Sequence, residues 1–314
     1  MARTSASSNT VVAPTSAAVG TRLLRGLRSE QLRAGYLFLL PTLLHFAVFV
    51  AFPVLYALYL SFHDWNMIGD RRFVGLENYQ TVLSDPKFLE SVQHTALFTV
   101  GVMAGILVMS LGLALALDNR IRAMNLFRGI YFSPAVTSVI VVGLVWMWMY
   151  HTQFGMVNLF LEQLGVRGPG WISDPNWALV SLIITALWKN VGYFAVIFLA
   201  GLQGIDEMYY EAARIDGAGG FGVFRHITLP LLMPTTFFVL VMGVILSFQV
   251  FGLVYVMTSG GPVGATTVIV YYLYEQAFVF FKMGYASAVA YVLFAIIFTL
   301  TLIQFRFLGR HAEL

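Results

Sequence analysis

The chain has 314 residues, of which 59% are hydrophobic and only 11% are charged, and its mean hydropathy is +0.80. An average soluble domain is about 25% charged, so this composition excludes a water-soluble globule and indicates an integral membrane protein. The net charge of +3 gives no indication of a nucleic-acid partner, and the absence of cysteine excludes disulfides, thiol catalysis and cysteine-ligated metal.

Residues 1–33 are expected to form a cytoplasmic N-terminal tail that is disordered at its start. Met1–Gly20 consists mainly of Ser, Ala, Thr and Val. It lacks the charged start, apolar run and small-residue cleavage site of a signal peptide. Residues 34–92 are then interpreted as a first transmembrane helix followed by an outer loop.

Six apolar segments are long enough for a spanning helix, which needs about 20 mostly apolar residues. They are Ala34–Phe62, Thr95–Leu117, Ile130–Tyr150, Trp177–Leu202, Leu231–Met257 and Tyr285–Phe307. The sequence therefore predicts an all-α, polytopic membrane protein with about six transmembrane helices. Its transport core is expected at 93–308, and a cytoplasmic C-terminal tail at 309–314.

Two further helical pieces are expected outside these spans. Phe73–Glu90 has the amphipathic pattern of a short interfacial helix. Thr267–Phe281 is expected to be helical at the outer surface, either as an interfacial or as a re-entrant segment.

The basic residues predict the orientation of the chain, because Lys and Arg are enriched in cytoplasmic loops. One set of loops carries Arg3, Arg22, Arg25, Arg28, Arg33, Arg120, Arg122, Arg128, Arg214, Arg225, Arg306 and Arg310. The opposite set carries Arg71, Arg72, Lys87, Arg167 and Lys282, and Lys189 lies within a span. Both termini and the loop between the fourth and fifth spans are therefore expected to face the cytoplasm.

Several classes of function lack the residues that they need. No expected span contains Asp or Glu, whereas proton-driven carriers commonly use an intramembrane carboxylate. None of the three lysines follows a glycine, so a phosphate-binding G-x-x-x-x-G-K-[ST] loop is excluded. The six histidines have no metal-ligand spacing and no acidic partner, so no catalytic constellation supports an enzyme.

A short polar segment separates the fourth and fifth spans. In Tyr209–Thr235, with the sequence "YYEAARIDGAGGFGVFRHITLPLLMPT", charged residues flank three glycines. Asp206 can cap a helix that begins at Glu207, and Gly217 can end that helix in a left-handed conformation. Glu211 and Arg214 lie three residues apart and can pair. The segment therefore predicts a compact helix–turn–helix, after which Leu229–Pro230 opens the next span; an ordinary amphipathic surface loop is the alternative.

The order of residues in "EAARIDGAGGFGVFRHITLP" resembles the EAA loop of permease subunits in binding-protein-dependent ABC importers. "FVGLENY" (73–79), "TSGGPVGATT" (258–267) and "MGYASA" (283–288) are similar to segments of the carbohydrate-uptake type. The chain departs from the family pattern at His94, where relatives often have Asn, and at Gly252, where many have Asp. It implies a type I ABC importer permease fold with a coupling loop at 205–230.

The resemblance also implies partners and a function. Glu211, Ala212, Ala213, Asp216, Gly217 and Pro230 would couple the chain to an ATPase subunit, present in two copies. ATP and Mg would act on that subunit, while this chain holds no cofactor and is not itself an enzyme. A second permease and an extracytoplasmic solute-binding protein would complete the importer in the inner or plasma membrane of a prokaryote. The solute is expected to be a sugar or sugar-like molecule.

Polar residues inside two spans are candidates for the substrate pathway: Lys189, Asn190, Tyr193, Ser247, Gln249, Phe251 and Tyr255. A charge within a membrane is costly, so Lys189 is expected to face a cavity or to pair with the second permease. The polar residues of the fifth span are also typical of contacts between membrane helices. Two alternative functions stay open: an ATP-independent secondary carrier, and an importer for a non-sugar solute such as a phosphorylated polyol.

Overall fold

The computed structural model describes residues 35–118 and 124–309, with the side chains of 124–128 excepted. The expected tail at 1–33 lies outside these residues, as does all of the tail at 309–314 except Gly309. The basic residues outside the described part are Arg3, Arg22, Arg25, Arg28, Arg33, Arg120, Arg122 and Arg310.

The chain divides into two compact units, one up to Ala57 and one from Leu58 to Leu314. The first unit is helical from Gly35. It contains the π-helix η1 (Ala47–Ala51) and most of α2 (Phe52–Ser61). The continuous helix of Gly35–Ser61 confirms the first expected span.

The second unit consists of helices and one small antiparallel ribbon. Its first elements are β1 (His63–Asp64), β2 (Arg72–Phe73), α3 (Glu77–Ser84), α4 (Pro86–Leu117), α5 (Met124–Val136), α6 (Val139–Met149), α7 (Met156–Gln163) and α8 (Pro175–Gln203). The remaining elements are α9 (Glu207–Ile215), α10 (Gly220–Val223), η2 (Phe224–Thr228), α11 (Leu229–Leu231), α12 (Met233–Phe248), α13 (Gly252–Met257), α14 (Ile269–Tyr274), η3 (Glu275–Val279) and α15 (Met283–Leu308).

Within the described residues, four helices are long and apolar enough to cross a membrane, and two bent helix pairs bring the number to as many as six. The unbroken helices are Gly35–Ser61, Pro86–Leu117, Pro175–Gln203 and Met283–Leu308. This arrangement confirms an all-α polytopic protein with about six transmembrane helices.

The third expected span, 130–150, is a bent pair rather than one helix. Helices α5 and α6 meet at 103° across Thr137 and Ser138. Pro134 lies inside α5 and cannot donate a backbone hydrogen bond, and Ser138 adopts an extended conformation before α6 begins. Hydropathy is continuous across this break, so the apolar pattern alone predicts a single span.

The fifth expected span, 231–257, is also interrupted. The helical run Gly220–Leu231 meets α12 at 63°, and α12 ends at Phe248, before a separate short helix α13. Pro230 therefore lies inside the first helical run, and the expectation that it opens the long helix is wrong. Pro234 occupies the first turn of α12 instead, where its missing amide hydrogen breaks the bond to the carbonyl four residues earlier.

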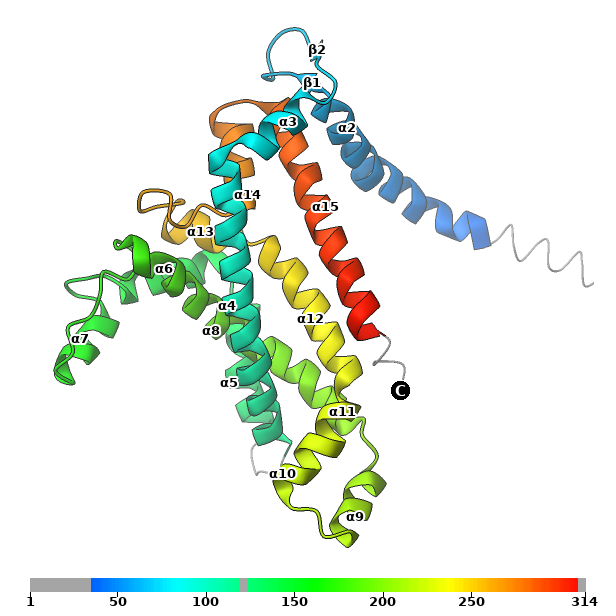
Figure 1. Cartoon of the computed structure of the whole chain (residues 1–314), viewed down its shortest axis with the longest axis vertical. Coiled ribbons are helices and arrows are strands. Elements are labelled where there is room, and N and C mark those ends of the chain that lie inside the picture. Colours follow the sequence, from blue (N-terminus) through cyan, green and yellow to red (C-terminus); the bar gives the residue numbers. More distant parts are fainter. Residues whose placement is uncertain (1–34, 119–123, 310–314) are drawn as a thin grey trace, which may run out of the picture. The chain divides into compact units, whose positions relative to one another are not determined.

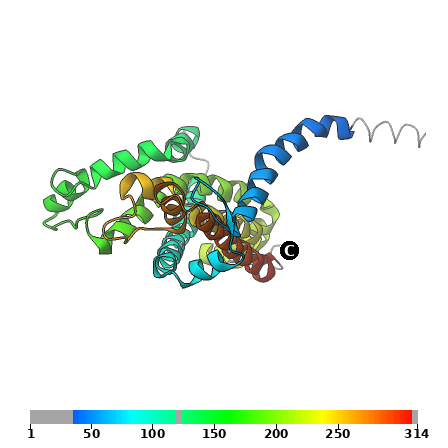
Figure 2. The same cartoon turned by 90° about the horizontal axis from the view of Figure 1, so that it is seen from above.

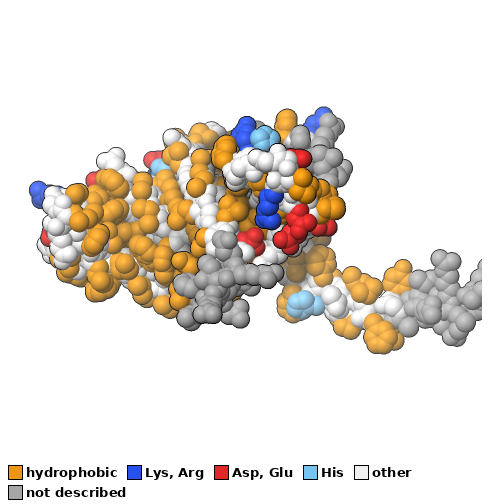
Figure 3. All heavy atoms as spheres, turned by 90° about the horizontal axis from the view of Figure 1, so that it is seen from below, with side chains coloured by type: hydrophobic (Ala, Val, Ile, Leu, Met, Phe, Trp, Pro, Cys, Tyr) orange, Lys and Arg blue, Asp and Glu red, His pale blue; other side chains and the backbone are white. Residues whose placement is uncertain are grey.

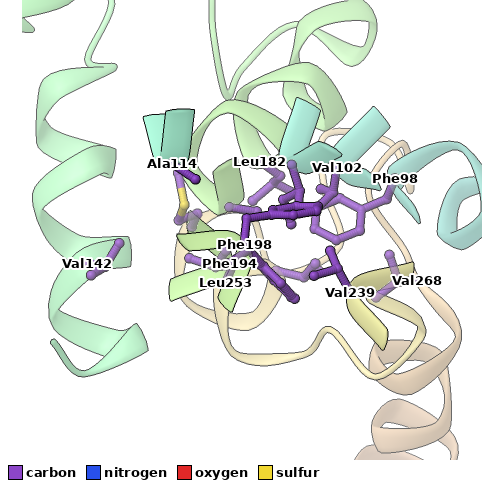
Figure 4. Packing of buried hydrophobic residues seen from close by; sticks show 14 of the residues in the cluster. Phe98, Val102, Ala114, Val142, Leu182, Phe194, Phe198, Val239, Leu253 and Val268 are labelled. Atoms are coloured by element: carbon purple, nitrogen blue, oxygen red, sulfur yellow. The ribbon is translucent and has the colours of Figure 1, made fainter. Parts of the chain in front are cut away.

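The bundle of the second unit places the polar segments at its two ends. Helices α4, α12 and α15 run between an end that carries β1, β2, α3 and α14 and an end that carries α9 and α10 (Figure 1). Helices α6 and α7 extend to one side of this bundle, as the view from above also shows (Figure 2). The core lies between α4, α8, α12 and α13, where the rings of Phe98, Phe194 and Phe198 gather (Figure 4).

Helix α8 packs closely on two neighbours. At Gly192 an added Cβ atom would collide with the backbone carbonyl of Tyr131 in α5, so only glycine permits this approach. On α4, Ser110 Oγ donates a hydrogen bond to the Val191 carbonyl oxygen at 3.0 Å. Backbone and side-chain contacts thus join α4, α5 and α8.

The end that carries α3 and α14 is stabilised by a hydrogen-bonded cluster of Asp85, Tyr272 and Tyr285. Asp85 Oδ2 accepts from the Tyr272 hydroxyl at 2.6 Å and from the Tyr285 hydroxyl at 3.0 Å. Partial burial raises the pKa of Asp85, but hydrogen bonds from Tyr272, the Lys87 amide and Tyr285 outweigh it and hold that pKa below its usual range. The cluster joins α4 to α14 and α15.

The two expected extra helices are present. Helix α3 (Glu77–Ser84) lies within 73–90, and α14 with η3 lies within 267–281. Tyr272 and Gln276 of this second segment are buried against the rest of the chain. The ribbon of β1 and β2, which pairs His63 with Phe73, and helix α7 have no counterpart in the sequence-based expectation.

Candidate functional site

The segment between α8 and α12 forms the expected helix–turn–helix, and α9 is capped at both ends. Asp206 Oδ1 accepts a hydrogen bond from the Met208 amide at 2.9 Å, which satisfies an otherwise unpaired donor of the first turn. At the other end, the Ala218 amide donates to the Ala213 carbonyl oxygen at 2.9 Å, and Gly217 has a φ of 77°. This left-handed glycine is the expected helix stop, so the local prediction for α9 is confirmed.

The two faces of α9 have different surroundings. Ala213 is buried, and Tyr210 accepts a hydrogen bond from the Thr228 hydroxyl at 3.4 Å. Glu211, Ala212, Asp216 and Gly217 are exposed. Of the two small alanines, therefore, only Ala212 is open to the approach of another surface.

Exposed apolar side chains accompany these polar groups. Met208, Tyr209, Ile215 and Phe221 are all exposed, and Ile215 is 86% accessible. Figure 3 views this end of the molecule, where acidic, basic and hydrophobic side chains lie side by side. Such a mixed patch on a short rigid helix is suited to contact with another protein.

Two details of the segment differ from expectation. Among the described residues, Glu211 and Arg214 do not form an ion pair. Pro230 lies in α11, apart from the exposed residues of α9.

A second candidate site is a cavity of about 310 Å³ between the helices of the core. Helices α4, α6, α8, α12 and α13 all contribute to its wall. Five of the seven residues predicted for the pathway line it: Lys189, Asn190, Ser247, Gln249 and Phe251. The structure therefore brings together polar residues from two separate expected spans.

The other two predicted residues do not line this cavity. Tyr193 is 37% exposed and packs its ring edge against Phe194 at 5.2 Å. Tyr255 is 45% exposed and stacks on Phe251 at 5.3 Å.

Lys189 lines the cavity and is bonded to the backbone of this same chain. Its Nζ donates to the carbonyl oxygens of Pro134, Ala135 and Thr137 at 3.2, 3.1 and 2.7 Å. These carbonyls belong to the last turn of α5 and to the break before α6, where no helical amide can pair with them. The ammonium therefore caps the C-terminal end of α5, whose dipole favours a cation.

Sequence reasoning missed several groups at this site. Phe98, Phe194 and Leu253 line the cavity. They also belong to the buried core cluster (Figure 4), and in the sequence they look like ordinary core residues. Tyr271 and Tyr274 join Phe251 and Tyr255 in an aromatic cluster beside the cavity, with ring centroids 5.3–6.4 Å apart. Their proximity depends on the folding of 267–281 against α13, for which the sequence carries no local signal.

A larger hollow of about 540 Å³ lies at the opposite end from α9. Charged side chains from four segments line it, among them Arg72, Glu77, Asp85, Lys87 and Lys282. Burial raises the pKa of nearby Glu275, an effect that the Lys87 charge opposes. Charged and apolar side chains thus share the wall of this hollow.

Comparison with known proteins agrees with this architecture. Residues 101–312 match the family described as binding-protein-dependent transport system inner membrane component. The chain is 37% identical over 282 residues to the sn-glycerol-3-phosphate transport system permease protein UgpA of Brucella suis, covering 88% of this chain and 95% of that protein.

Two further relatives have similar levels of identity. The sulfoquinovosyl glycerol transport system permease protein SmoG of Agrobacterium fabrum is 35% identical over 86% of this chain and 88% of its own length. The trehalose/maltose transport system permease protein MalF of Thermococcus litoralis is 34% identical over 89% of this chain and 95% of its own length.

The fold has a close counterpart among solved structures. A chain of a bacterial alginate ABC transporter, solved in complex with an alginate-bound periplasmic protein, superposes with a TM-score of 0.80 at 22% identity. The match covers 93% of this chain and 99% of the other. From the sequence match and the shared fold, this chain belongs to the family of inner-membrane permease components of binding-protein-dependent transport systems.

Proposed function

We propose that this chain is a permease subunit of an ATP-driven importer that carries a sugar or sugar-like solute. The observation that carries the proposal is α9, a short helix capped at both ends with Glu211 and Ala212 on its open face. A rigid element of this kind transmits a displacement, whereas a flexible loop absorbs it. An ATP-independent carrier has no use for such a docking helix.

In this proposal the chain works as one part of a larger assembly. A second permease supplies the other wall of the pathway, and an external solute-binding protein delivers the solute. Two copies of an ATPase subunit bind ATP and Mg and hydrolyse the nucleotide. When these subunits close, they move α9 and shift the attached spans between outward-open and inward-open states.

The cavity beside Lys189 is proposed to be this chain's share of the solute pathway. Asn190, Ser247 and Gln249 offer amide and hydroxyl groups, and Phe251 offers an aromatic face. Hydroxyl-rich solutes bind through such groups, with a few polar side chains in a largely apolar wall. The names of the SmoG and MalF relatives, which refer to sulfoquinovosyl glycerol and to trehalose and maltose, support a solute that contains a sugar.

A phosphorylated polyol is the second candidate solute. The relative UgpA is named for sn-glycerol-3-phosphate transport, and Lys189 is a cationic group at the wall of the cavity. The two candidates differ in charge, which makes the environment of Lys189 the deciding feature.

Reversal of the Glu211 charge tests the coupling role. In Glu211→Lys, and separately in Gly217→Asp, the importer is expected to lose solute-stimulated ATP hydrolysis by at least about tenfold, equivalent to ~1.4 kcal/mol of coupling. The measurement is ATP hydrolysis by the complete complex, purified through a tag on this chain, together with solute uptake by proteoliposomes.

A matched control is Glu162→Lys, which reverses an exposed carboxylate in α7. This variant is expected to retain both activities. Undiminished transport in the two α9 variants would remove the coupling role of this helix, and equal losses in all three variants would attribute the effect to any change of surface charge.

A further inference from the structure

We propose that the cavity of this chain selects an uncharged, hydroxyl-rich solute, because its one cationic side chain is fully engaged by the protein backbone. This inference rests on the proposed function and narrows its substrate class. It excludes a role for Lys189 as the receptor of a phosphate, sulfonate or carboxylate group.

The hydrogen-bonding capacity of Lys189 carries the first step. A lysine ammonium has three N–H donors and no acceptor. In this structure three carbonyl oxygens, those of Pro134, Ala135 and Thr137, lie within 3.2 Å of Nζ. An anionic solute would therefore have to displace a backbone carbonyl from the ammonium before it gained a hydrogen bond of its own.

The electrostatic surroundings give the second step. The three acceptors lie at the C-terminal end of α5, where the helix dipole is equivalent to about −0.5 elementary charge. This partial negative charge faces the ammonium directly and offsets much of its field. The potential inside the cavity is consequently weaker than the formal charge of Lys189 suggests.

The rest of the wall gives the third step. Among the described residues that line this cavity, Lys189 is the only charged side chain. The other polar groups, Asn190, Ser247 and Gln249, are neutral and are suited to exchange hydrogen bonds with hydroxyl groups. Nothing else in this wall compensates the desolvation of an anion, which is costly without a partner.

Removal of the Lys189 ammonium has a separate structural cost. Without it, three carbonyls at the α5–α6 break would be left without a donor inside the bundle. Lys189→Met removes both the charge and the donors. Lys189→Gln removes the charge but keeps an amide that can donate to some of the three carbonyls. The second variant serves where the first fails to assemble.

The absence of cysteine from the chain allows a direct test of the charge in the cavity. Gln249→Cys places a single thiol at the cavity wall, and Tyr255→Cys places one on a nearby exposed position that does not line the cavity. Each thiol is treated, in the complete complex, with an anionic and a neutral methanethiosulfonate reagent of similar size. The ratio of the two reaction rates reports the local potential.

We expect the anionic-to-neutral rate ratio in Gln249→Cys to lie within about fivefold of the ratio in Tyr255→Cys, and Lys189→Met or Lys189→Gln to change it by less than that factor. The inference would be overturned if the anionic-to-neutral rate ratio in Gln249→Cys were more than about fivefold higher than in Tyr255→Cys and fell when Lys189 was replaced. Such a result would mean that a free cation faces the solute.

Solute uptake after modification separates this result from the proposed function. Modification of the thiol at position 249 is expected to block uptake by reconstituted importer. If uptake survives modification at position 249, the cavity lies off the pathway, and both the proposed pathway and this inference fail. If uptake is blocked while the rate ratio is high, only the inference of an uncharged solute fails.

Discussion

Single residues in this chain hold together elements that are far apart in the sequence. Asp85 lies at the start of α4, yet its carboxylate accepts hydrogen bonds from Tyr272 and Tyr285, which are 187 and 200 positions away. Lys189 makes a comparable link from α8 to the end of α5. Each link joins helices whose apolar surfaces alone would leave their relative positions loosely fixed.

The Asp85 cluster predicts a pH dependence of stability. The pKa of Asp85 is lowered in the folded protein from its ordinary 3.8, so the ionised carboxylate stabilises the fold above that pH. The contribution is lost as the pH falls through the lower, folded-state pKa. We expect the difference in Tm between the wild type and Asp85→Asn in detergent to be largest near neutral pH and to shrink below about pH 4.

Asp174→Asn is a suitable control, because Asp174 caps α8 through the Asn176 amide without tyrosine partners. Its effect on Tm is expected to be smaller at neutral pH. A difference between the wild type and Asp85→Asn that stays constant down to about pH 3 would show that the hydrogen bonds do not depend on ionisation of Asp85.

At the scale of elements, glycines decide how closely the helices approach. Gly192 of α8 faces the backbone of α5, and Gly105 of α4 faces the side chain of Leu187. Small residues permit such contacts between membrane helices, where packing rather than the hydrophobic effect favours association. The sequence shows where the glycines are but not which of them lie where two helices cross.

Gly192→Ala and Gly112→Ala form a matched pair that tests this packing. The Cβ introduced by Gly192→Ala would collide with the Tyr131 carbonyl, whereas nothing lies within 4 Å of a Cβ at position 112. We expect Gly192→Ala to destabilise the protein by about 1–3 kcal/mol. Gly112→Ala is expected to be neutral or slightly stabilising, by up to ~1 kcal/mol, because alanine favours a helix.

Unfolding of each variant in detergent, followed by circular dichroism, measures the difference. Equal stabilities of the two variants would mean that α5 can move away from α8 at little cost. The capping of α5 by Lys189 would then be the stronger of the two links.

Much of the local structure of α9 was predictable, because its signals are adjacent in the sequence. Asp206 lies directly before the helix and Gly217 just beyond its end, so caps and bounds follow from short-range rules. The break between α5 and α6 was not predictable in the same way. Hydropathy continues across 137–138, and the ammonium that pairs with the exposed carbonyls comes from a residue more than fifty positions later.

The cavity shows the same limit. Lys189 and Gln249 stand out as polar residues in apolar segments, and both line it. Phe98 and Phe194 are equally close to it, but an aromatic residue in a membrane helix gives no sign of whether it packs or lines a cavity. Tyr193 and Tyr255 carry similar polar groups and lie outside the wall, because the direction of a side chain depends on how the helices pack.

At the scale of the whole molecule, the two polar ends of the bundle face opposite directions. The end with α9 is expected in the cytoplasm and the end with the β ribbon outside, as the distribution of Lys and Arg predicts. Helices α4, α12 and α15 run between these ends (Figure 1), and the helical run that follows α9 meets α12 at 63°. In the proposed function, a displacement at α9 would reach the cavity across this bend.

This orientation can be tested with single cysteines at two exposed positions. Asp70→Cys lies in the β1–β2 loop, and Ala218→Cys lies directly after α9. In intact cells or spheroplasts, a membrane-impermeant maleimide is expected to label Asp70→Cys readily and Ala218→Cys only after permeabilisation. Labelling of the thiol at position 218 from outside would invert the topology and exclude contact between α9 and a cytoplasmic ATPase.

The close packing of α8 against α4 and α5 has a consequence for how solute passes. Helix α8 meets the backbone of α5 at Gly192, and partly buried hydrogen bonds join it to α4 and to the α5–α6 break. We therefore expect these three helices to move as one block. Along the proposed pathway, passage would require this block to part from α12 and α13. These two helices border the same cavity and are separated from each other by the non-helical residues 249–251. We therefore expect a change in the angle between α12 and α13 at residues 249–251 to change the volume of the cavity.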